Sequence, residues 1–519
     1  MAARKARGAG RAAGKKAIWV RGPRRRKVGG GFEPEELCPK LLKFAMAQRG
    51  VGEAEAYVSK NRMTQARVET LRHGRRQIGP NAQQALVLEN MEACVRVVVK
   101  GAVGTAATLY LDDESLRRTA AEARKAAAMM APDPNFRSLA KPPKGGYLKL
   151  PADRKIISGD VSEALMGQVE AAAGCFPQGL DLAGSIIAIS EVFSVRNSNG
   201  ICVERGEDSF AVAQLTGEKV DGGEVISSGM GWSASRWLDK LDARAAARKA
   251  LELATLTPKL KSVPEGDYDV LLGPYAVADV IDNMLFSQIG LGSIYSGTSW
   301  LPAERRQNEK GTQLRWPGLG EMIADERITL REEPHLRDGM GSKTADDEGV
   351  PTQPRNLIEN GVWKGVFANS YYAHLYGMEP PGNGFRHGSR PGRIASAPIS
   401  SSSTNLLLTP GDMKLDELVK ECRGSALYVP RTWYTYPTRY GASGFSSSNR
   451  STAFLIENGE MTPIAPNAFK LRGDASRVLK EVKCIGKETV AATTWSASFC
   501  SFVPHILTGG IRVEKPAGD

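Results

Sequence analysis

The chain has 519 residues, of which 41% are hydrophobic and 24% are charged, values that are ordinary for a globular protein. This length exceeds what one hydrophobic core usually organises, so we expect two folded domains. No apolar run approaches the roughly 20 residues that span a bilayer, and the start is too polar for a secretory signal. We therefore expect a cytoplasmic protein with no membrane partner.

The net charge of +12 belongs to one end of the chain. Residues 1–27 hold eleven Lys or Arg and no acid, so the remainder is close to neutral. This end is rich in Ala and Gly and has no apolar periodicity, which predicts a disordered basic tail over residues 1–32. Clustered Lys and Arg bind phosphates without needing a fold. We therefore expect no nucleic-acid partner except one bound non-specifically by this tail.

Residues 33–262 predict an N-terminal domain of helices and antiparallel sheet. A helix is expected at 34–49, followed by β-rich runs at 53–73 and 85–111 with a turn at residues 79–81 between them. Asp112 and Asp113 would start a second helix and Pro132 would stop it. Its inward face would hold Leu116, Ala120, Ala123, Ala127 and Met130.

The same domain continues with a helix at about 160–175 and β-hairpins at 184–228. Asn199 and Gly200 mark one hairpin turn. A last helix, near 234–256, repeats small residues at helical spacing, which predicts close packing on a sheet. These residues are Ala243, Ala246, Ala247, Ala250, Leu251 and Ala254.

Pro264, Glu265 and Gly266 separate that helix from a strand at 268–272, and we place the second domain at residues 263–519. Short strands and Gly or Pro turns follow, with one clear helix that Asp412 would cap and Gly424 would end. Its inward residues would be Leu415, Leu418, Val419 and Cys422. This pattern suits a β-rich domain that is barrel-like or a sandwich, and the fold class is α+β.

Residues 346–365 are the most informative segment. Asp346, Asp347 and Glu348 form an acidic turn closed by Gly349, and residues 360–361, Asn then Gly, predict a tight hairpin. From the residues alone, a surface hairpin is the favoured interpretation.

The wording of this segment resembles the signature of the TldD/PmbA family, whose members form cytoplasmic metallopeptidase assemblies that act on small peptides. PmbA is also called TldE. Further matches follow in order at residues 381–384, 404–412, 444–446 and 456–460, and looser ones precede them at 53–58, 95–108 and 132–136. The resemblance runs from about residue 34 to the end.

In the TldD branch, a Leu-Gly-Pro strand end leads into a helix with the motif His-Glu-x-x-x-His. Its histidines bind zinc, its Glu is the general base, and a distant Cys completes the site. Counting from residues 272–274, which are Leu, Gly and Pro here, puts Asp282, Asn283 and Ser287 at the three motif positions.

These replacements remove what zinc chemistry needs. A catalytic zinc takes about three protein ligands and leaves one position open for water. Ser287 is a poor zinc ligand, and Asn283 cannot exchange a proton with water. Asp282 alone could still ligate. We expect no catalytic residue, metal or other cofactor in this chain.

The resemblance therefore implies the non-catalytic TldE-like subunit of a heterodimeric zinc peptidase that degrades or matures small unfolded peptides. Zinc is expected in a TldD-like catalytic partner, and pairing with a second copy of this chain is the other possibility for assembly. Peptide capture would use exposed strand edges, because main-chain hydrogen bonds suit an extended substrate. The predicted peptide-binding residues are Asp347, Glu348, Gly349, Gly382, Asn383 and Gly384.

Three alternatives remain open. The first is a stand-alone peptidase with its metal relocated to Asp282, His374 or Cys500, although the five histidines show no paired spacing and the seven cysteines no C-x-x-C. The second is a modulator of a DNA topoisomerase or its toxin, as an older description of the family as gyrase modulators suggests. The third is a homodimeric binding protein without enzymatic activity.

Overall fold

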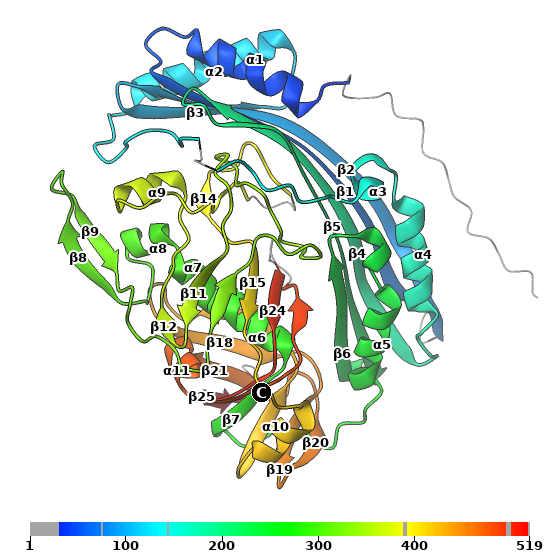
Figure 1. The fold of residues 1–519 in the computed structure, drawn as a ribbon. Helices are drawn as coiled ribbons and strands as arrows, with labels where there is room; N and C mark the ends of the chain where they lie inside the picture. Colours follow the sequence, from blue (N-terminus) through cyan, green and yellow to red (C-terminus); the bar gives the residue numbers. More distant parts are fainter. Residues whose placement is uncertain (1–30, 74–75, 143–144, 388–391, 495–499, 517–519) are drawn as a thin grey trace, which may run out of the picture.

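The computed structural model describes residues 31–516, except 74–75, 143–144, 388–391 and 495–499. A long curved sheet forms the N-terminal half, and the C-terminal half lies against its concave face (Figure 1). The α+β class is confirmed. The predicted tail lies outside the described residues apart from Gly31 and Phe32. Among the described residues, no helix is long and apolar enough to cross a membrane.

The N-terminal sheet has the strand order β3-β2-β1-β4-β5-β6, and every neighbouring pair is antiparallel. The strands are β1 (Glu53–His73), β2 (Arg76–Val99), β3 (Ala102–Thr108), β4 (Leu180–Asn197), β5 (Cys202–Asp221) and β6 (Glu224–Ser235). Helices cover the face turned away from the C-terminal half (Figure 1). They are α1 (Pro34–Met46), α2 (Asp113–Met129), α3 (Arg154–Ser158), α4 (Ser162–Ala173) and α5 (Ala243–Ala254).

The predicted close packing of the alanine-rich helix is confirmed in α5. Its alanines at 243, 246, 247, 250 and 254 are all buried. A Cβ on Gly231 of β6 would overlap the carbonyl of Ala246, and one on Gly229 would overlap that of Ala250. Small residues on both surfaces therefore let the helix backbone approach the sheet.

The predicted turn at residues 79–81 is wrong. Gly79 pairs with Leu71 and Pro80 with Thr70, so β1 and β2 continue past this point as one long hairpin. Register shifts at 67/68 and 71/72 accommodate the glycine and proline, as β-bulges do. The run at 85–111 is instead divided at Lys100 and Gly101, and the expected inward Met130 is exposed.

The C-terminal half contains two larger sheets. One curls into an open half-barrel with the order β17-β18-β21-β25-β7-β16-β19-β20, and β22 pairs with β25. Its strands are β7 (Gly266–Leu272), β16 (Ser425–Val429), β17 (Thr432–Pro437), β18 (Gly444–Asn449), β19 (Ala453–Glu457), β20 (Glu460–Ile464), β21 (Lys470–Asp474), β22 (Val482–Ile485) and β25 (Ile506–Glu514).

The second sheet has the order β12-β11-β10-β15-β24-β23. Its strands are β10 (Leu330–Glu332), β11 (Arg355–Glu359), β12 (Val362–Trp363), β15 (Asn405–Leu408), β23 (Val490–Ala492) and β24 (Cys500–Val503). Two short pairs complete the half, namely β8 (Ala303–Gln307) with β9 (Gln313–Pro317) and β13 (Gly384–Phe385) with β14 (Ser400–Ser401). The hairpin predicted at 360–361 is confirmed between β11 and β12, with positive φ at both turn residues.

The expectation of one clear helix in this half is wrong, because several short ones occur. They are α6 (Pro274–Val280), the π-helical turn η2 (Ile281–Leu285), α7 (Phe286–Ile289), α8 (Leu291–Ser296), α9 (Ser370–Leu375), α10 (Leu415–Glu421) and α11 (Ala475–Lys480). The predicted helix is α10, but Lys414 rather than Asp412 precedes it. The Glu417 carboxylate accepts the Lys414 N–H at 2.7 Å, which fixes the start.

Candidate functional site

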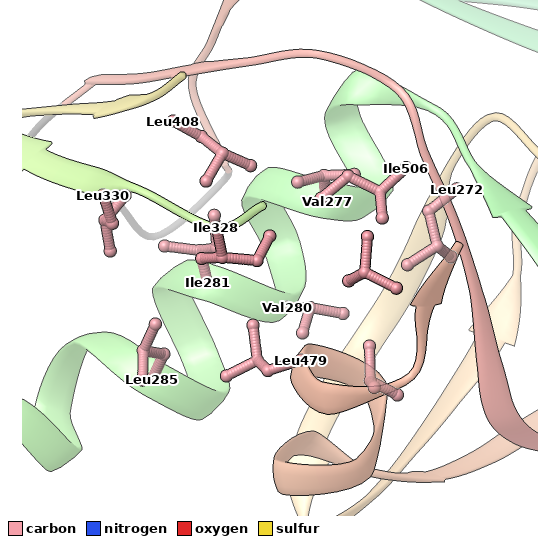
Figure 2. Close-up of a pocket in the computed structure, with 12 residues that line it drawn as sticks. Leu272, Val277, Val280, Ile281, Leu285, Ile328, Leu330, Leu408, Leu479 and Ile506 are labelled. Carbon is pink, nitrogen blue, oxygen red and sulfur yellow. The ribbon is translucent and has the colours of Figure 1, made fainter. Parts of the chain in front are cut away.

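The segment that carries the predicted motif positions is the helical stretch from α6 to α7. β7 ends at Leu272, the chain turns at Gly273, and Pro274 takes the first helical position, where proline fits. A Cβ on Gly273 would lie 2.8 Å from the Cα of Pro430, so the close backbone approach requires glycine. The buried face of this stretch lies against a cavity of about 20 Å³ lined only by Leu, Ile and Val side chains (Figure 2).

The backbone of this stretch suits the spacing of the family's metal motif. Positions 282 and 287 are five residues apart, which places them about 140° apart around an ordinary α-helix. Here Ile281–Leu285 form a π-helical turn, and the Phe286 N–H donates to the Ile281 carbonyl. A π turn bonds residue i to residue i+5 and so brings positions five apart towards one face. The helix geometry is therefore present, while the metal-binding side chains are not.

Asp282 is half-buried, and both of its carboxylate oxygens are hydrogen-bonded. Thr494 donates its hydroxyl to Oδ2 and Ser501 donates its hydroxyl to Oδ1, each at 2.8 Å. Although Asp282 as a whole is partly exposed, its carboxyl group is enclosed by neighbouring groups. This desolvation raises the pKa of Asp282 to about 7, and nearby Asp279 adds to the rise, while the two hydroxyls oppose it.

Asn283 and Ser287 face other partners. The Asn283 amide donates to the carbonyl and the carboxylate of Asp279, both at 2.9 Å. Asp279 is buried and also accepts hydroxyl hydrogen bonds from Thr432 at 2.7 Å and from Thr435. Ser287 is exposed and accepts a hydrogen bond from the Gln288 amide. The three motif positions therefore do not converge on a common point.

Cys500, which stands near the position of the family's cysteine ligand, is close to Asp282. Burial raises the pKa of its thiol, and Asp282 raises it further. The thiol points its hydrogen toward the Ala492 carbonyl, with the sulfur 3.7 Å from that oxygen. A protonated thiol and one carboxylate held by two hydroxyls do not make a zinc site. The residues present therefore do not fit the metal that the family motif binds.

The structure also does not assemble the relocated metal site. Within the described ranges, no three His, Cys, Asp or Glu side chains gather in a way that could hold a metal ion. His374 lies in α9, and His505 contacts the Tyr428 hydroxyl at 3.4 Å. Burial lowers the pKa of His505 to about 4. Cys500 and His505 therefore contact different groups, the Ala492 carbonyl and the Tyr428 hydroxyl.

The two predicted peptide-binding segments are brought together, but inside the molecule. The Asp347 N–H donates to the Gly384 carbonyl at 2.9 Å, and the Gly384 N–H donates to Asp346 at 2.8 Å. Asp347, Glu348 and Asn383 are at most 2% exposed. The surface interpretation of residues 346–349 is therefore wrong. Their burial also argues against direct contact between these side chains and a peptide.

Arginines and a tyrosine explain how so many acids can be buried here. Asp347 pairs with Arg393, accepts the Tyr57 hydroxyl at 2.7 Å and accepts the Arg386 N–H at 2.6 Å. Burial alone would raise the pKa of Asp347, but Arg393 and these hydrogen bonds hold it below its usual value. Arg393 also pairs with Asp208 of β5 at 3.0 Å. These contacts of the acidic turn thus hold the C-terminal half against the concave face of the N-terminal sheet.

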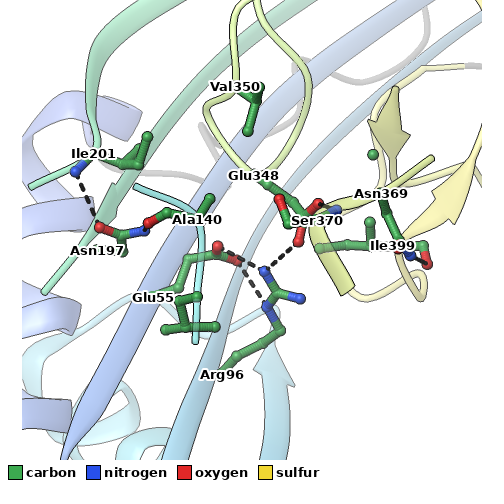
Figure 3. Close-up of polar contacts among 12 residues, drawn as sticks. Glu55, Arg96, Ala140, Asn197, Ile201, Glu348, Val350, Asn369, Ser370 and Ile399 are labelled. Atoms are coloured by element: carbon green, nitrogen blue, oxygen red, sulfur yellow. Dashed lines mark hydrogen bonds and ion pairs between the residues drawn. The ribbon is translucent and has the colours of Figure 1, made fainter. Parts of the chain in front are cut away.

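A second bridge lies beside the first. Arg96 of β2 binds Glu55 of β1 at 2.7 Å and Glu348 at 3.0 Å, and Glu348 accepts the Ser370 N–H at 2.6 Å (Figure 3). A pocket of about 360 Å³ opens next to Arg96. Its lining is Arg96, Val103, Thr105, Asn369, Arg386, Ser396, Ala397, Pro398 and Ile399. Because both of its arginines are already paired with carboxylates, this pocket offers no unmatched charge.

Two residues of interest were missed by the sequence reasoning. Asp279 lies on the same polar side of the helix as Asp282, and its spacing of three residues could have indicated this. Arg431, between β16 and β17, is buried beside the rings of Tyr275 and Trp433. No sequence pattern distinguishes it from other arginines.

Known proteins resemble this chain in sequence. The model of the PmbA/TldA metallopeptidase C-terminal domain matches residues 265–515. A metalloprotease of Methanothermobacter thermautotrophicus is 27% identical over 300 residues, 56% of this chain and 59% of that protein. A metalloprotease TldD homologue of Buchnera aphidicola is 28% identical over 243 residues, 47% of this chain and 45% of that protein. The matched parts therefore span about half the length of these relatives.

The fold is also shared with a solved structure. TldE from Thermococcus kodakarensis superimposes with a TM-score of 0.76 at 22% identity, over 92% of this chain and 99% of that one. At this identity the likeness concerns the fold. The family model over the C-terminal half and the metalloprotease relatives support the TldD/PmbA metallopeptidase family for this chain, and the shared fold agrees with it.

Proposed function

We propose that this chain is the non-catalytic, TldE-like subunit of a heterodimeric zinc peptidase that acts on small unfolded peptides. The main observation behind the proposal concerns the helical stretch from α6 to α7, which we call the motif helix, and the contacts of its side chains. Its π turn suits a pair of ligands five residues apart, yet Asp282 is held by Thr494 and Ser501, and Ser287 is exposed to solvent. The catalytic zinc would then be bound by a TldD-like partner.

A stand-alone peptidase is less well supported. Hydrolysis at a zinc site requires a bound water whose pKa is lowered and a base that takes its proton. Asn283 cannot ionise, and its amide is already bonded to Asp279. Asp282 has a pKa near neutrality, but one carboxyl group without metal ligands around it does not supply the remaining parts.

Co-expression with a TldD-like chain that carries His-Glu-x-x-x-His tests the proposal. We expect a one-to-one complex by light scattering, one zinc per complex by elemental analysis, and cleavage of unstructured peptides that neither chain achieves alone. Replacing the partner's motif histidines should abolish zinc and cleavage, whereas Asp282→Asn in this chain should leave both within about twofold, since an isosteric amide keeps hydroxyl contacts. Full activity and one equivalent of zinc in this chain alone would disprove the proposal.

A further inference from the structure

Arg431 is a buried cation without a charged or hydrogen-bonding partner among the residues that the structure describes. The residue is 7% exposed, and its buried Nε–H donates to no described acceptor. Among the described residues, no ion pair and no side-chain hydrogen bond involves its guanidinium. Its guanidinium carbon is instead 4.8 Å from the ring centroid of Trp433 and 5.6 Å from that of Tyr275.

The acids nearest to this arginine are already occupied. Asp279 accepts the hydroxyls of Thr432 and Thr435, and Glu218 lies 3.6 Å from Arg450. Burial lowers the pKa of Arg431, the neighbouring Arg450 contributes in the same direction, and Tyr275, Asp279 and Glu218 oppose the change. Aromatic faces attract a cation but replace only part of its lost hydration. The arginine thus keeps an unused, planar set of donors.

Other buried arginines in the molecule do not share this condition. Arg236 pairs with Asp208 at 3.0 Å, Arg386 pairs with Glu55 at 3.4 Å, and Arg393 pairs with Asp347. A guanidinium presents paired N–H groups that match a carboxylate in two parallel hydrogen bonds. Arg431 has the same geometry available, and none of the described residues provides the acceptor that would match it.

The surroundings of Arg431 suit a peptide rather than a small ion. The next strand, β17, is at the end of the nine-stranded sheet, where an extended peptide can add by main-chain pairing. Tyr434, Tyr436 and Tyr440 are exposed around it, and Tyr434 has a φ of 56°, which is strained for a bulky residue. Strained residues and exposed aromatic rings concentrate at binding sites.

This strand is also tied to the motif helix. Thr432 and Thr435 of β17 both bond to Asp279, near the end of α6 and just before the π turn. A peptide lying along β17 would therefore pass beside the helix that carries the family's metal motif. We propose that Arg431, flanked by Tyr275 and Trp433, binds a carboxylate of an extended peptide, either its C-terminus or an Asp or Glu side chain. This inference rests on the proposed role in peptide processing, and it names the carboxylate as the substrate feature that this subunit recognises.

The test measures peptide binding by the full chain, using fluorescence anisotropy and three rhodamine-labelled decapeptides of Gly, Ser and Ala. One ends in a free carboxylate, one is amidated, and one is amidated but contains an internal Glu. We expect a carboxylate-bearing peptide to bind about 10- to 100-fold more tightly than the neutral one, as a charge-assisted hydrogen-bonded pair provides. The free-acid and internal-Glu peptides distinguish the two sources of the carboxylate.

Two variants and a matched control complete the experiment. Arg431→Met should remove the preference for the carboxylate, Arg431→Lys should retain part of it, and Arg450→Gln, at a half-buried neighbour that pairs with Glu218, should leave it unchanged. The melting temperature of Arg431→Met should be unchanged or higher, because no partner is left unpaired. A preference that survives in Arg431→Met would overturn the inference, as would its absence in the unmodified chain, its equal loss in Arg450→Gln, or a fall in melting temperature for Arg431→Met but not Arg431→Lys.

The proposed function is judged separately by complex formation and cleavage with the TldD-like partner. If the complex forms and cleaves peptides but shows no carboxylate preference, only the assignment of Arg431 fails. If the carboxylate preference is present and no active complex forms, the binding site stands and the subunit role fails.

Discussion

Buried arginines occur in two regions of this molecule, and the regions differ in what surrounds them. Around the acidic turn, Arg393 and Arg386 meet buried carboxylates that join the two halves of the chain. Beside β17, Arg431 meets aromatic rings and none of the described carboxylates. A paired buried charge fixes an arrangement, whereas an unpaired one costs stability. The family's sequence signature therefore marks architecture here, and the candidate for ligand chemistry lies elsewhere.

The largest expected difference between the regions is in stability. Arg393→Met removes a cation that serves both Asp347 and Asp208, so the buried Asp347 loses its ion-pair partner while Asp208 keeps Arg236. We expect a loss of about 3–5 kcal/mol in the free energy of unfolding, measured in urea. Arg331→Met is the matched surface control, because Arg331 is half exposed and lies 3.8 Å from Glu333. The control should cost at most about 1 kcal/mol. Equal losses in the two variants would contradict the structural role of the network.

The acidic turn and Asp282, on the helix next to β17, should respond to pH in opposite directions. The pKa of Asp347 is held below its usual value, so the stability it provides is present above the unfolded pKa of about 3.9 and is lost as pH falls through the lower folded value. The pKa of Asp282 is raised to about 7, so its protonated form is favoured in the folded chain. The corresponding stability is complete below about pH 4 and is lost as pH rises to 7.

Asp282→Asn separates these two effects. Because the amide does not titrate, the variant should lack the loss of stability between pH 4 and 7, which is on the order of 2 kcal/mol for a carboxyl of a half-buried residue. It should keep the loss on acidification that the Asp347 network causes. Urea unfolding at intervals from pH 3 to 8 measures both limbs. A variant with the same slope as the unmodified chain between pH 4 and 7 would show that Asp282 is ionised throughout this range.

Local signals in the sequence predicted much of the fold. The alanine repeat at 243–254 predicted close packing, and Asn360 with Gly361 predicted the hairpin, because in each case the cause lies within a few residues. The turn at 79–81 was misplaced because cross-strand pairing over the long hairpin outweighed the local preference of Gly and Pro. Burial of the acidic turn was also missed. Its partners at 57, 96 and 393 are distant in sequence, so nothing nearby indicates that its charges are matched.

The candidate site was predicted in part. The Leu-Gly-Pro pattern placed Asp282 and Asn283 correctly on a helix, since a strand end and a proline at a helix start are local features. The π turn could not be predicted, because it follows from how the segment packs. Arg431 could not be found at all, because what distinguishes it is a missing partner, and absence of a contact is a property of the folded chain.

The smallest expected effect concerns the apolar packing of the motif helix. It tests whether this packing is independent of the polar groups on the other side of the helix. Val280 is 5% exposed and lines the cavity of about 20 Å³ (Figure 2), so one added methylene has room. Val280→Ile should therefore stabilise the chain by about 0.5 kcal/mol. Val366→Ile is the matched control, because Val366 is 2% exposed and does not line this cavity, and overpacking there should cost about 1–3 kcal/mol. Urea unfolding measures both changes, and the pH dependence contributed by Asp282 should be the same in Val280→Ile as in the unmodified chain. A changed pH dependence would show that the packing of the motif helix and the ionisation of Asp282 are coupled. The polar side of this helix could then not be treated as independent of the apolar core.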